Sequence, residues 1–522
     1  MARSMGGRVI ARRLGGWLGG EALAAPASAR TTLLLALALL GSLLAAYLVL
    51  QAMATPPRIV DDALTVLVAG LLLLALLRWP KPALLVFALY MLFGDTISHW
   101  LGFGLAHVDE LFVPLALAIT AVRARPWRGR LEPLREGAVV ALVGLALAAS
   151  LVNGVPMAVW LPGLVLLVKV IAFLYVCAWH DFNATDVRQL GLVVLAVGIV
   201  AIGLGYVEAL NPAAFRAALN VSDAGEARGV LPSVKGVFYH PVLFGWFAAL
   251  LGLYCFAAFV HYRRWYWLLG GLLFSAGVLM AARRRAIVGL AAAAVGGFVA
   301  SWWPRRDWRA SARQWAPVAA GLLLVGTVFA AGLGDLIEQT QNEYLLPPVV
   351  GEPGVPVEAS EGTAREALYR GALVVAADYF PLGAGLGRYG SWMSRIEYSP
   401  VYHDLGFDTI WGLKPSFPHF ITDTFWPQIL GEIGVFGVLA YVVFIGAVGI
   451  GLWRAAHAFD DPLLAAFCLG TLMVFGHALV ETLASSMFHS PPRVYLLFGA
   501  VGMALSLLRV AGPRGVARVD AG

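Results

Sequence analysis

Three consecutive arginines, Arg283-Arg284-Arg285, lie between two apolar runs of the chain. Guanidinium groups bind phosphate oxygens through paired hydrogen bonds, so this triplet predicts an anion site suited to a diphosphate. A charged side chain at the centre of a bilayer costs about 2.5–3.5 kcal/mol on insertion scales, so three together require a compensating role. The alternative is that the helix count is wrong by one and the triplet belongs to a cytoplasmic loop.

A second group of basic side chains, Arg228, Lys235 and His240, precedes the apolar run at 238–260 or lies at its start. The pair His240-Pro241 predicts a helix start, because proline is favoured at the first helical position. We expect these side chains to add positive charge to the site of the arginine triplet and to bind the same ligand. The alternative is an interfacial belt of aromatic and long cationic side chains.

Two candidate proton acceptors, His419 and Asp423, lie four residues apart. On a helix they would share one face. Either could take a proton from a sugar hydroxyl, so we predict that one of them is the catalytic base. The alternative is an ordinary interfacial histidine followed by a helix cap.

A glycine-rich run at 381–390 contains Arg388. A dinucleotide-binding loop would need a strand before it and a helix after it, and neither is indicated. We therefore expect a tight loop, with Arg388 facing a ligand. Each of the three cysteines, Cys177, Cys255 and Cys468, lies in an apolar run without metal-binding spacing, so no cofactor and no metal are expected.

The elements that must position these side chains are membrane helices. The chain has 522 residues, of which 60% are hydrophobic and 13% charged, whereas a soluble domain carries about 25% charged residues. Lipid must therefore be the solvent for much of the chain. We predict an all-α, polytopic transmembrane helix bundle of about 12–14 helices, with apolar runs at 31–51, 62–77, 82–94, 107–122, 137–152, 161–179, 189–209, 238–260, 265–282, 284–302, 316–334, 428–453, 463–480 and 493–509.

The distribution of cations predicts the orientation. If the N-terminus is cytoplasmic and the helices alternate, more than half of the 37 Lys and Arg fall on the inner side, as the positive-inside rule requires. The arginine triplet then lies at the outer membrane side, against that rule. The net charge of +6 is explained by the cytoplasmic flanks, so no nucleic acid partner is expected.

This orientation divides the chain into five parts. They are a disordered cytoplasmic tail at 1–30, a bundle of about 11 helices at 31–334, a large periplasmic loop with short helices at 335–427, C-terminal transmembrane helices at 428–510 and a cytoplasmic tail at 511–522. Within the large loop, Thr363-Ala364-Arg365-Glu366 matches a capping box. It predicts a helix that runs to about Asp378 and ends before Pro381.

Four segments, taken in this order, resemble the O-antigen ligase / O-antigen polymerase superfamily. They are 236–241 with Gly245, Arg284 at the start of a new helix, Arg365 and Tyr369 with 381–387, and Glu432-Ile433-Gly434 with Gly437. The resemblance covers about residues 160–455. The chain departs from the family at two places. The family often has His-Asn before the Glu of Glu-x-Gly, whereas this chain has Asp423-Thr424 there. Arg283 stands where the arginine motif of the family has a serine.

The resemblance implies a membrane glycosyltransferase at the periplasmic face of a bacterial inner membrane. Its partners would be a polyprenyl-diphosphate-linked glycan donor, a glycan or lipid A-core acceptor, and membrane lipids. Arg284 and Arg285 would bind the diphosphate, and His419 or Asp423 would activate the acceptor for inverting, metal-independent attack. Two other classes stay open: a polysaccharide or lipid transporter (flippase) without glycosyl transfer, and a non-catalytic envelope scaffold.

Overall fold

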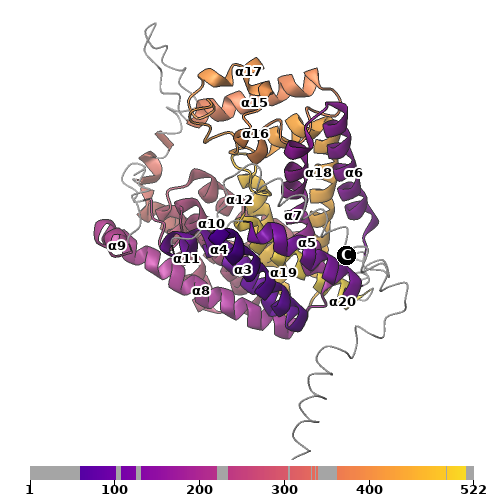
Figure 1. Cartoon of the computed structure of the whole chain (residues 1–522). Coiled ribbons are helices and arrows are strands. Elements are labelled where there is room, and N and C mark those ends of the chain that lie inside the picture. Colours follow the sequence, from indigo (N-terminus) through magenta and orange to yellow (C-terminus); the bar gives the residue numbers. More distant parts are fainter. Residues whose placement is uncertain are drawn as a thin grey trace, which may run out of the picture.

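The computed structural model describes residues 59–101, 107–124, 131–219, 233–303, 306–330, 332–335, 337–338, 361–489 and 491–512. Over these ranges the chain consists of helices and the turns that join them, without a β-strand. Figure 1 shows a bundle of long helices with short helices gathered at one end. The predicted fold class, an all-α polytopic membrane helix bundle, is confirmed.

Thirteen of the fourteen predicted spans coincide with helices of this bundle, and the first, at 31–51, lies outside the described residues. Within the described ranges, nine helices are long and apolar enough to cross a membrane. The bundle helices are α3 (Ile59–Arg78), α4 (Pro80–Leu101), α5 (Val108–Ala124), α6 (Pro133–Val152), α7 (Met157–Trp179), α8 (Ala184–Leu210), α10 (Pro241–Tyr262), α11 (Trp265–Met280), α12 (Arg284–Trp302), α13 (Trp308–Val328), α18 (Trp426–His457), α19 (Pro462–Glu481) and α20 (Arg493–Ala511), and the short helix α9 (Pro212–Ala218) follows α8.

Several helices begin at a side chain that accepts a hydrogen bond from a first-turn amide, often followed by proline. His240 caps α10 in this way through Nδ1, which accepts from the amide of Val242 at 3.1 Å. Asp461 caps α19 through two amides and is followed by Pro462. These ends follow from local chemistry, because a cap satisfies an amide that has no partner inside the helix. The helix start predicted at His240-Pro241 is confirmed.

The bundle has a centre and a lipid-facing periphery. In α10, 89% of the residues of the membrane span are buried inside the protein, whereas in α8 only 22% are. Figure 1 shows α8 along one edge of the bundle. An apolar helix whose residues are mostly uncovered by protein requires lipid around it, so the exposed faces of α8 are membrane surface.

The large loop forms a small helical layer at one end of the bundle, here called the loop end (Figure 1). Its helices are α15 (Glu361–Asp378), α16 (Trp392–Ile396), α17 (Pro400–Asp404) and the 3₁₀ turn η2 (Phe407–Thr409), which share a core of Leu368, Tyr389, Tyr402 and Phe407. The predicted end of α15 at Asp378 is confirmed. Its start is Glu361, so Thr363 lies inside the first turn instead of at the cap.

The glycine-rich run folds as the expected tight loop and packs against a break in α18. The amides of Gly387 and Tyr389 donate to Glu432 Oε1 at 2.7 and 3.3 Å. At the break, Gly434 has a φ of 73° and a Cβ there would lie 2.2 Å from the Pro381 carbonyl oxygen. Glu432 and Gly434 therefore have a structural function: they fix the loop to the helix.

Candidate functional site

The turn after α19, residues 482–489, connects the arginine triplet to the large loop. Arg285 donates to the carbonyl of Ala484 at 2.9 Å. The Tyr369 hydroxyl of α15 donates to the carbonyl of the preceding residue, Leu483, at 2.8 Å. The triplet and α15 thus lie at the same end of the bundle and contact neighbouring residues of one turn.

Four cations gather around His240. The positive charges of Arg283, Arg285, Arg493 and Lys235 all act on its imidazole. Arg283, Arg493 and Lys235 are buried, and Arg285 and Arg284 are half-buried. The structure therefore brings together residues from the two basic segments of the sequence and adds a cation from α20.

Arg493 is the residue that sequence reasoning missed. It is the first residue of α20 and is paired with Glu481, the last residue of α19, at 2.8 Å. A signal was present in the sequence, because Arg493 begins the last predicted span, at the end that the predicted orientation places outside, where the positive-inside rule disfavours cations. It is easily read as an ordinary cationic flank of an apolar run.

Asp423 joins this cluster through α15. Its carboxylate accepts a hydrogen bond from Arg365 at 3.0 Å and also interacts electrostatically with Arg493. We call the set Lys235, His240, Arg283, Arg285, Arg365, Asp423, Glu481 and Arg493 the basic cluster.

Cations exceed carboxylates in the basic cluster by five to two. A further acid, Glu208, accepts from the amides of Lys235 and Gly236, but it is paired with its own cation, Arg216, at 2.8 Å. The surplus is reinforced by the N-terminal ends of α10, α12 and α20, which begin beside these residues. Helix N-termini carry partial positive charge, so the arrangement favours an anion.

His240 stays neutral in this setting. Part of the His240 surface is exposed, but burial of the ring by surrounding protein, followed by the charges of Arg283, Arg285, Arg493 and Lys235, lowers its pKa from 6.5 to about 4. Because Nδ1 accepts from the Val242 amide, the proton of the neutral ring is on Nε2. His240 can therefore donate a hydrogen bond to an anion but is not placed to act as a base.

His419 lies apart from the basic cluster as far as the described contacts extend. It is exposed and stacks on Phe417 with ring centroids 4.1 Å apart. Residues 418–425 form turns, with the amide of Asp423 bonded to the carbonyl of Phe420, so the helical face that the four-residue spacing predicts for His419 and Asp423 does not exist. The structure brings only Asp423 of this pair to the cluster.

Two other predicted ligand-binding residues are not in the basic cluster. Arg388 lies in the glycine-rich loop beside Glu432, and no described contact joins it to Arg285 or Arg493. Arg228 lies outside the described residues. Among the residues that the structure describes, no three His, Cys, Asp or Glu side chains are grouped as metal ligands.

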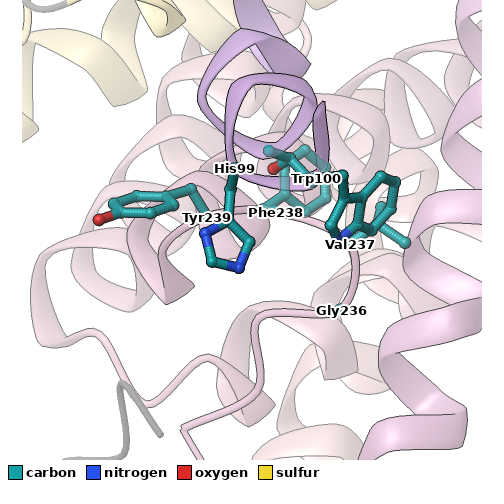
Figure 2. Close-up of a pocket in the computed structure, with 7 residues that line it drawn as sticks. His99, Trp100, Gly236, Val237, Phe238 and Tyr239 are labelled. Atoms are coloured by element: carbon teal, nitrogen blue, oxygen red, sulfur yellow. The ribbon is translucent and has the colours of Figure 1, made fainter. Parts of the chain in front are cut away.

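A small apolar pocket adjoins the basic cluster along the chain. It is lined by residues 236–239, which connect Lys235 to His240, and by Thr96, His99 and Trp100 at the end of α4. Figure 2 shows Trp100 beside Val237 and His99 beside Tyr239. Exposed aromatic rings here, Trp100 and Tyr239, place an amphipathic rim next to the cations.

No known protein-family model and no curated protein matches this chain.

Proposed function

We propose that the chain is a membrane glycosyltransferase that transfers a glycan from a polyprenyl diphosphate to an acceptor hydroxyl. The observation that carries this proposal is the surplus of buried and half-buried guanidinium groups at the loop end of the bundle, around a neutral histidine. A diphosphate attached to a long apolar chain is a ligand that requires both features. Its headgroup needs cations, and its tail needs lipid beside them.

The leaving-group half of the reaction would use the basic cluster. When the glycosidic carbon breaks its bond to the phosphate oxygen, negative charge develops on the departing diphosphate. Arg285 and Arg493 would stabilise that charge, with the Nε2–H of His240 as a further donor. Preorganised donors of this kind contribute about 3–4 kcal/mol each in other enzymes.

The acceptor half would use Asp423. An acceptor hydroxyl forms the new bond to the glycosidic carbon from the face opposite the diphosphate and gives its proton to the Asp423 carboxylate. The products are an inverted glycoside and a free polyprenyl diphosphate. The ion pair with Arg365 would orient Asp423, so α15 would position the base as well as cover the site.

The large loop supports this chemistry because hydrolysis is the competing reaction. Its helix α15 is fixed to the cluster by Arg365 and to the 482–489 turn by Tyr369. A lid held at these two points could exclude water while the acceptor binds.

The proposed location follows from charge and from the lipid-linked donor. We infer that the loop end faces the periplasm of a bacterial inner membrane, with membrane lipids around the uncovered helices. The acceptor would be a growing glycan, as in an O-antigen polymerase, or lipid A-core, as in an O-antigen ligase. Deletion in the native host distinguishes these: single-unit product indicates a polymerase, and long chains stranded on the carrier lipid indicate a ligase.

A transporter or flippase is the second candidate, and one observation favours it. Lys169, inside the apolar helix α7, is paired with Asp109 and Glu110 at 2.8 Å each, and the Tyr495 hydroxyl donates to Asp109 at 2.6 Å. Buried, paired charges at membrane depth are typical of ion pathways. The basic cluster contains more charged groups than this network and lies at one membrane end, which is why transfer is preferred.

The test is glycan transfer by the purified chain in liposomes that contain polyprenyl-diphosphate glycan and acceptor. We expect new glycosidic product, and we expect Arg285→Ala to reduce its rate of formation by about a hundredfold to a thousandfold. Arg264→Ala is the matched control, since Arg264 is exposed at the opposite end of α11.

Movement of the glycan lipid across the bilayer without new product would favour the flippase. Full transfer by the Arg285 variant would contradict the proposed site, and unchanged surface glycan after neutralising Arg284 and Arg285 in cells would favour a scaffold.

A further inference from the structure

In the buried ion pair between Glu481 and Arg493, one carboxylate oxygen of Glu481 has a hydrogen-bond partner and the other has none among the described residues. Arg493 donates to Glu481 Oε2 at 2.8 Å, and both side chains are almost fully buried, with 6% and 1% of their surfaces exposed for Arg493 and Glu481. The second oxygen, Glu481 Oε1, is buried and has no hydrogen-bond partner among the described residues. A buried carboxylate in a purely structural pair normally has both oxygens satisfied, because an unsatisfied one is costly.

Other buried polar atoms without partners lie in the turn that follows Glu481 and in the segment 424–428, which leads into α18. Within the described chain, Thr424 Oγ1, Ser485 Oγ and His489 Nε2 are also buried without a hydrogen bond. These segments are in contact, because Trp426 Nε1 donates to Thr482 Oγ1 at 3.1 Å and His489 Nδ1 lies 3.2 Å from Gln428 Oε1. Two of the unsatisfied groups are chain neighbours of residues that contact the cluster: Thr424 follows Asp423, and Ser485 follows Ala484, whose carbonyl accepts from Arg285. A polar ligand or a rearrangement there would satisfy them.

The same short stretch of chain occupies two arginines of the cluster. Glu481 binds Arg493, and three residues later the carbonyl of Ala484 accepts from Arg285. Arg493 and Arg285 also act on each other electrostatically, as like charges. Residues 481–484 thus supply one carboxylate oxygen and one carbonyl oxygen to the two guanidinium groups. The oxygens of a diphosphate would accept hydrogen bonds from the same two groups.

We propose that residues 481–484 act as a built-in competitor for the diphosphate, with Glu481 as the anion that must leave Arg493 when the ligand binds. The inference rests on the proposed function and concerns how its anion site is occupied between turnovers. A diphosphate carries more negative charge than one carboxylate and offers several oxygens to two arginines at once, so it displaces Glu481 and Ala484 together. Glu481 is a positioning residue in this scheme: between turnovers it holds the Arg493 side chain in place and neutralises its charge.

The scheme predicts opposite effects for the two partners of one ion pair. Removing the competing charge in Glu481→Gln should tighten anion binding, because Arg493 then gives up only a neutral amide. Removing the cation in Arg493→Gln should weaken it. If the pair only holds α19 against α20, both substitutions loosen the site and both weaken binding.

The experiment measures inorganic pyrophosphate binding to the full chain in nanodiscs by titration calorimetry at one pH and ionic strength. We expect binding by the wild type, about threefold to tenfold tighter binding by Glu481→Gln, and at least about tenfold weaker binding by Arg493→Gln. Thermal unfolding verifies that each variant is folded. If Glu481→Gln does not fold, Glu481→Asp takes its place, because the shorter carboxylate reaches Arg493 less well and should also tighten binding.

Two outcomes overturn different claims. Weaker binding by both Glu481→Gln and Arg493→Gln, with wild-type binding intact, overturns the competitor scheme and leaves the proposed function standing. No pyrophosphate binding by the wild type overturns the anion site, and with it both the proposed function and this inference.

Discussion

Arg365 of α15 and Asp423, in the segment that leads into α18, are joined by an ion pair of 3.0 Å. The pair connects α15 to α20, because Asp423 also interacts electrostatically with Arg493 at the start of α20. A base that depends on the loop for its orientation would be placed only when α15 covers the site. Acceptor activation and water exclusion would then be coupled through one side chain.

Replacing Asp423 tests whether it takes the acceptor proton. Asp423→Asn keeps the shape but removes the basic oxygen, so we expect the single-turnover transfer rate to fall by about a hundredfold to ten-thousandfold. Pyrophosphate binding should change much less, since the amide is not part of the cationic half of the site.

The matched controls for Asp423→Asn are His419→Ala and Asp408→Asn, both at exposed positions of the same loop. We expect each to retain the transfer rate within about twofold, as for surface substitutions in general. A large loss in His419→Ala together with an active Asp423→Asn would reverse the assignment and make His419 the base.

The sequence predicts this fold well because the signals that determine it are local. Apolar runs, the alternation of cations across the membrane and the pair His240-Pro241 each act within a few residues. They identify the positions of thirteen described helices. The end of α15 near Asp378 is likewise set by Pro381, which cannot continue a helix.

The site could be predicted only in part, because its remaining members are brought together by tertiary contacts. The arginine triplet is visible in the sequence because three consecutive cations lie between two apolar runs. The pairing of Arg493 with Glu481 is not visible, since it depends on where the turn after α19 returns. The shared face predicted for His419 and Asp423 is absent for a related reason: four-residue spacing places side chains on one face only in a helix, and Pro415 and Pro418 favour turns there.

The protonation of His240 predicts a specific acid sensitivity. Its folded pKa of about 4 lies below the ordinary 6.5 because of burial and the neighbouring cations. Between these values the unfolded chain binds more protons than the folded chain, so the contribution of His240 to stability is complete above about pH 6.5 and is lost as the pH falls toward 4.

His240→Asn should reduce this loss, because asparagine can still cap α10 but does not titrate. The measurement is the thermal unfolding temperature in detergent at pH 7 and at pH 4.5 for both proteins. We expect a smaller difference between the two pH values in the variant. An identical difference in both proteins would show that His240 is protonated at an ordinary pKa.

The buried network around Lys169 predicts a large effect on stability. Lys169→Met leaves Asp109 without its lysine and Glu110 with His107 as its remaining basic partner; only 6% and 7% of the Asp109 and Glu110 side chains are exposed. Losing one partner of a buried ion pair costs about 3–5 kcal/mol. Lys81→Met is the control, because its pair with Asp186 is more accessible and should contribute about 0–1 kcal/mol. Comparable losses of thermal stability in the two variants would contradict the burial of the Lys169 network.

The junction between the glycine-rich loop and α18 depends on the absence of a side chain at Gly434. Its φ of 73° disfavours any L-residue with a Cβ, and an added Cβ would lie 2.2 Å from the Pro381 carbonyl oxygen. Gly434→Ala should therefore move the loop away from Glu432 and destabilise the protein by more than about 2 kcal/mol.

Gly446→Ala is the matched control within the same helix, since nothing described lies within 4 Å of its added Cβ and alanine has the higher helix propensity. Thermal unfolding and limited proteolysis of the 381–390 loop provide the comparison: only the Gly434 variant should unfold earlier and be cut faster. Equal behaviour of the two variants would mean that the loop does not depend on the break in α18.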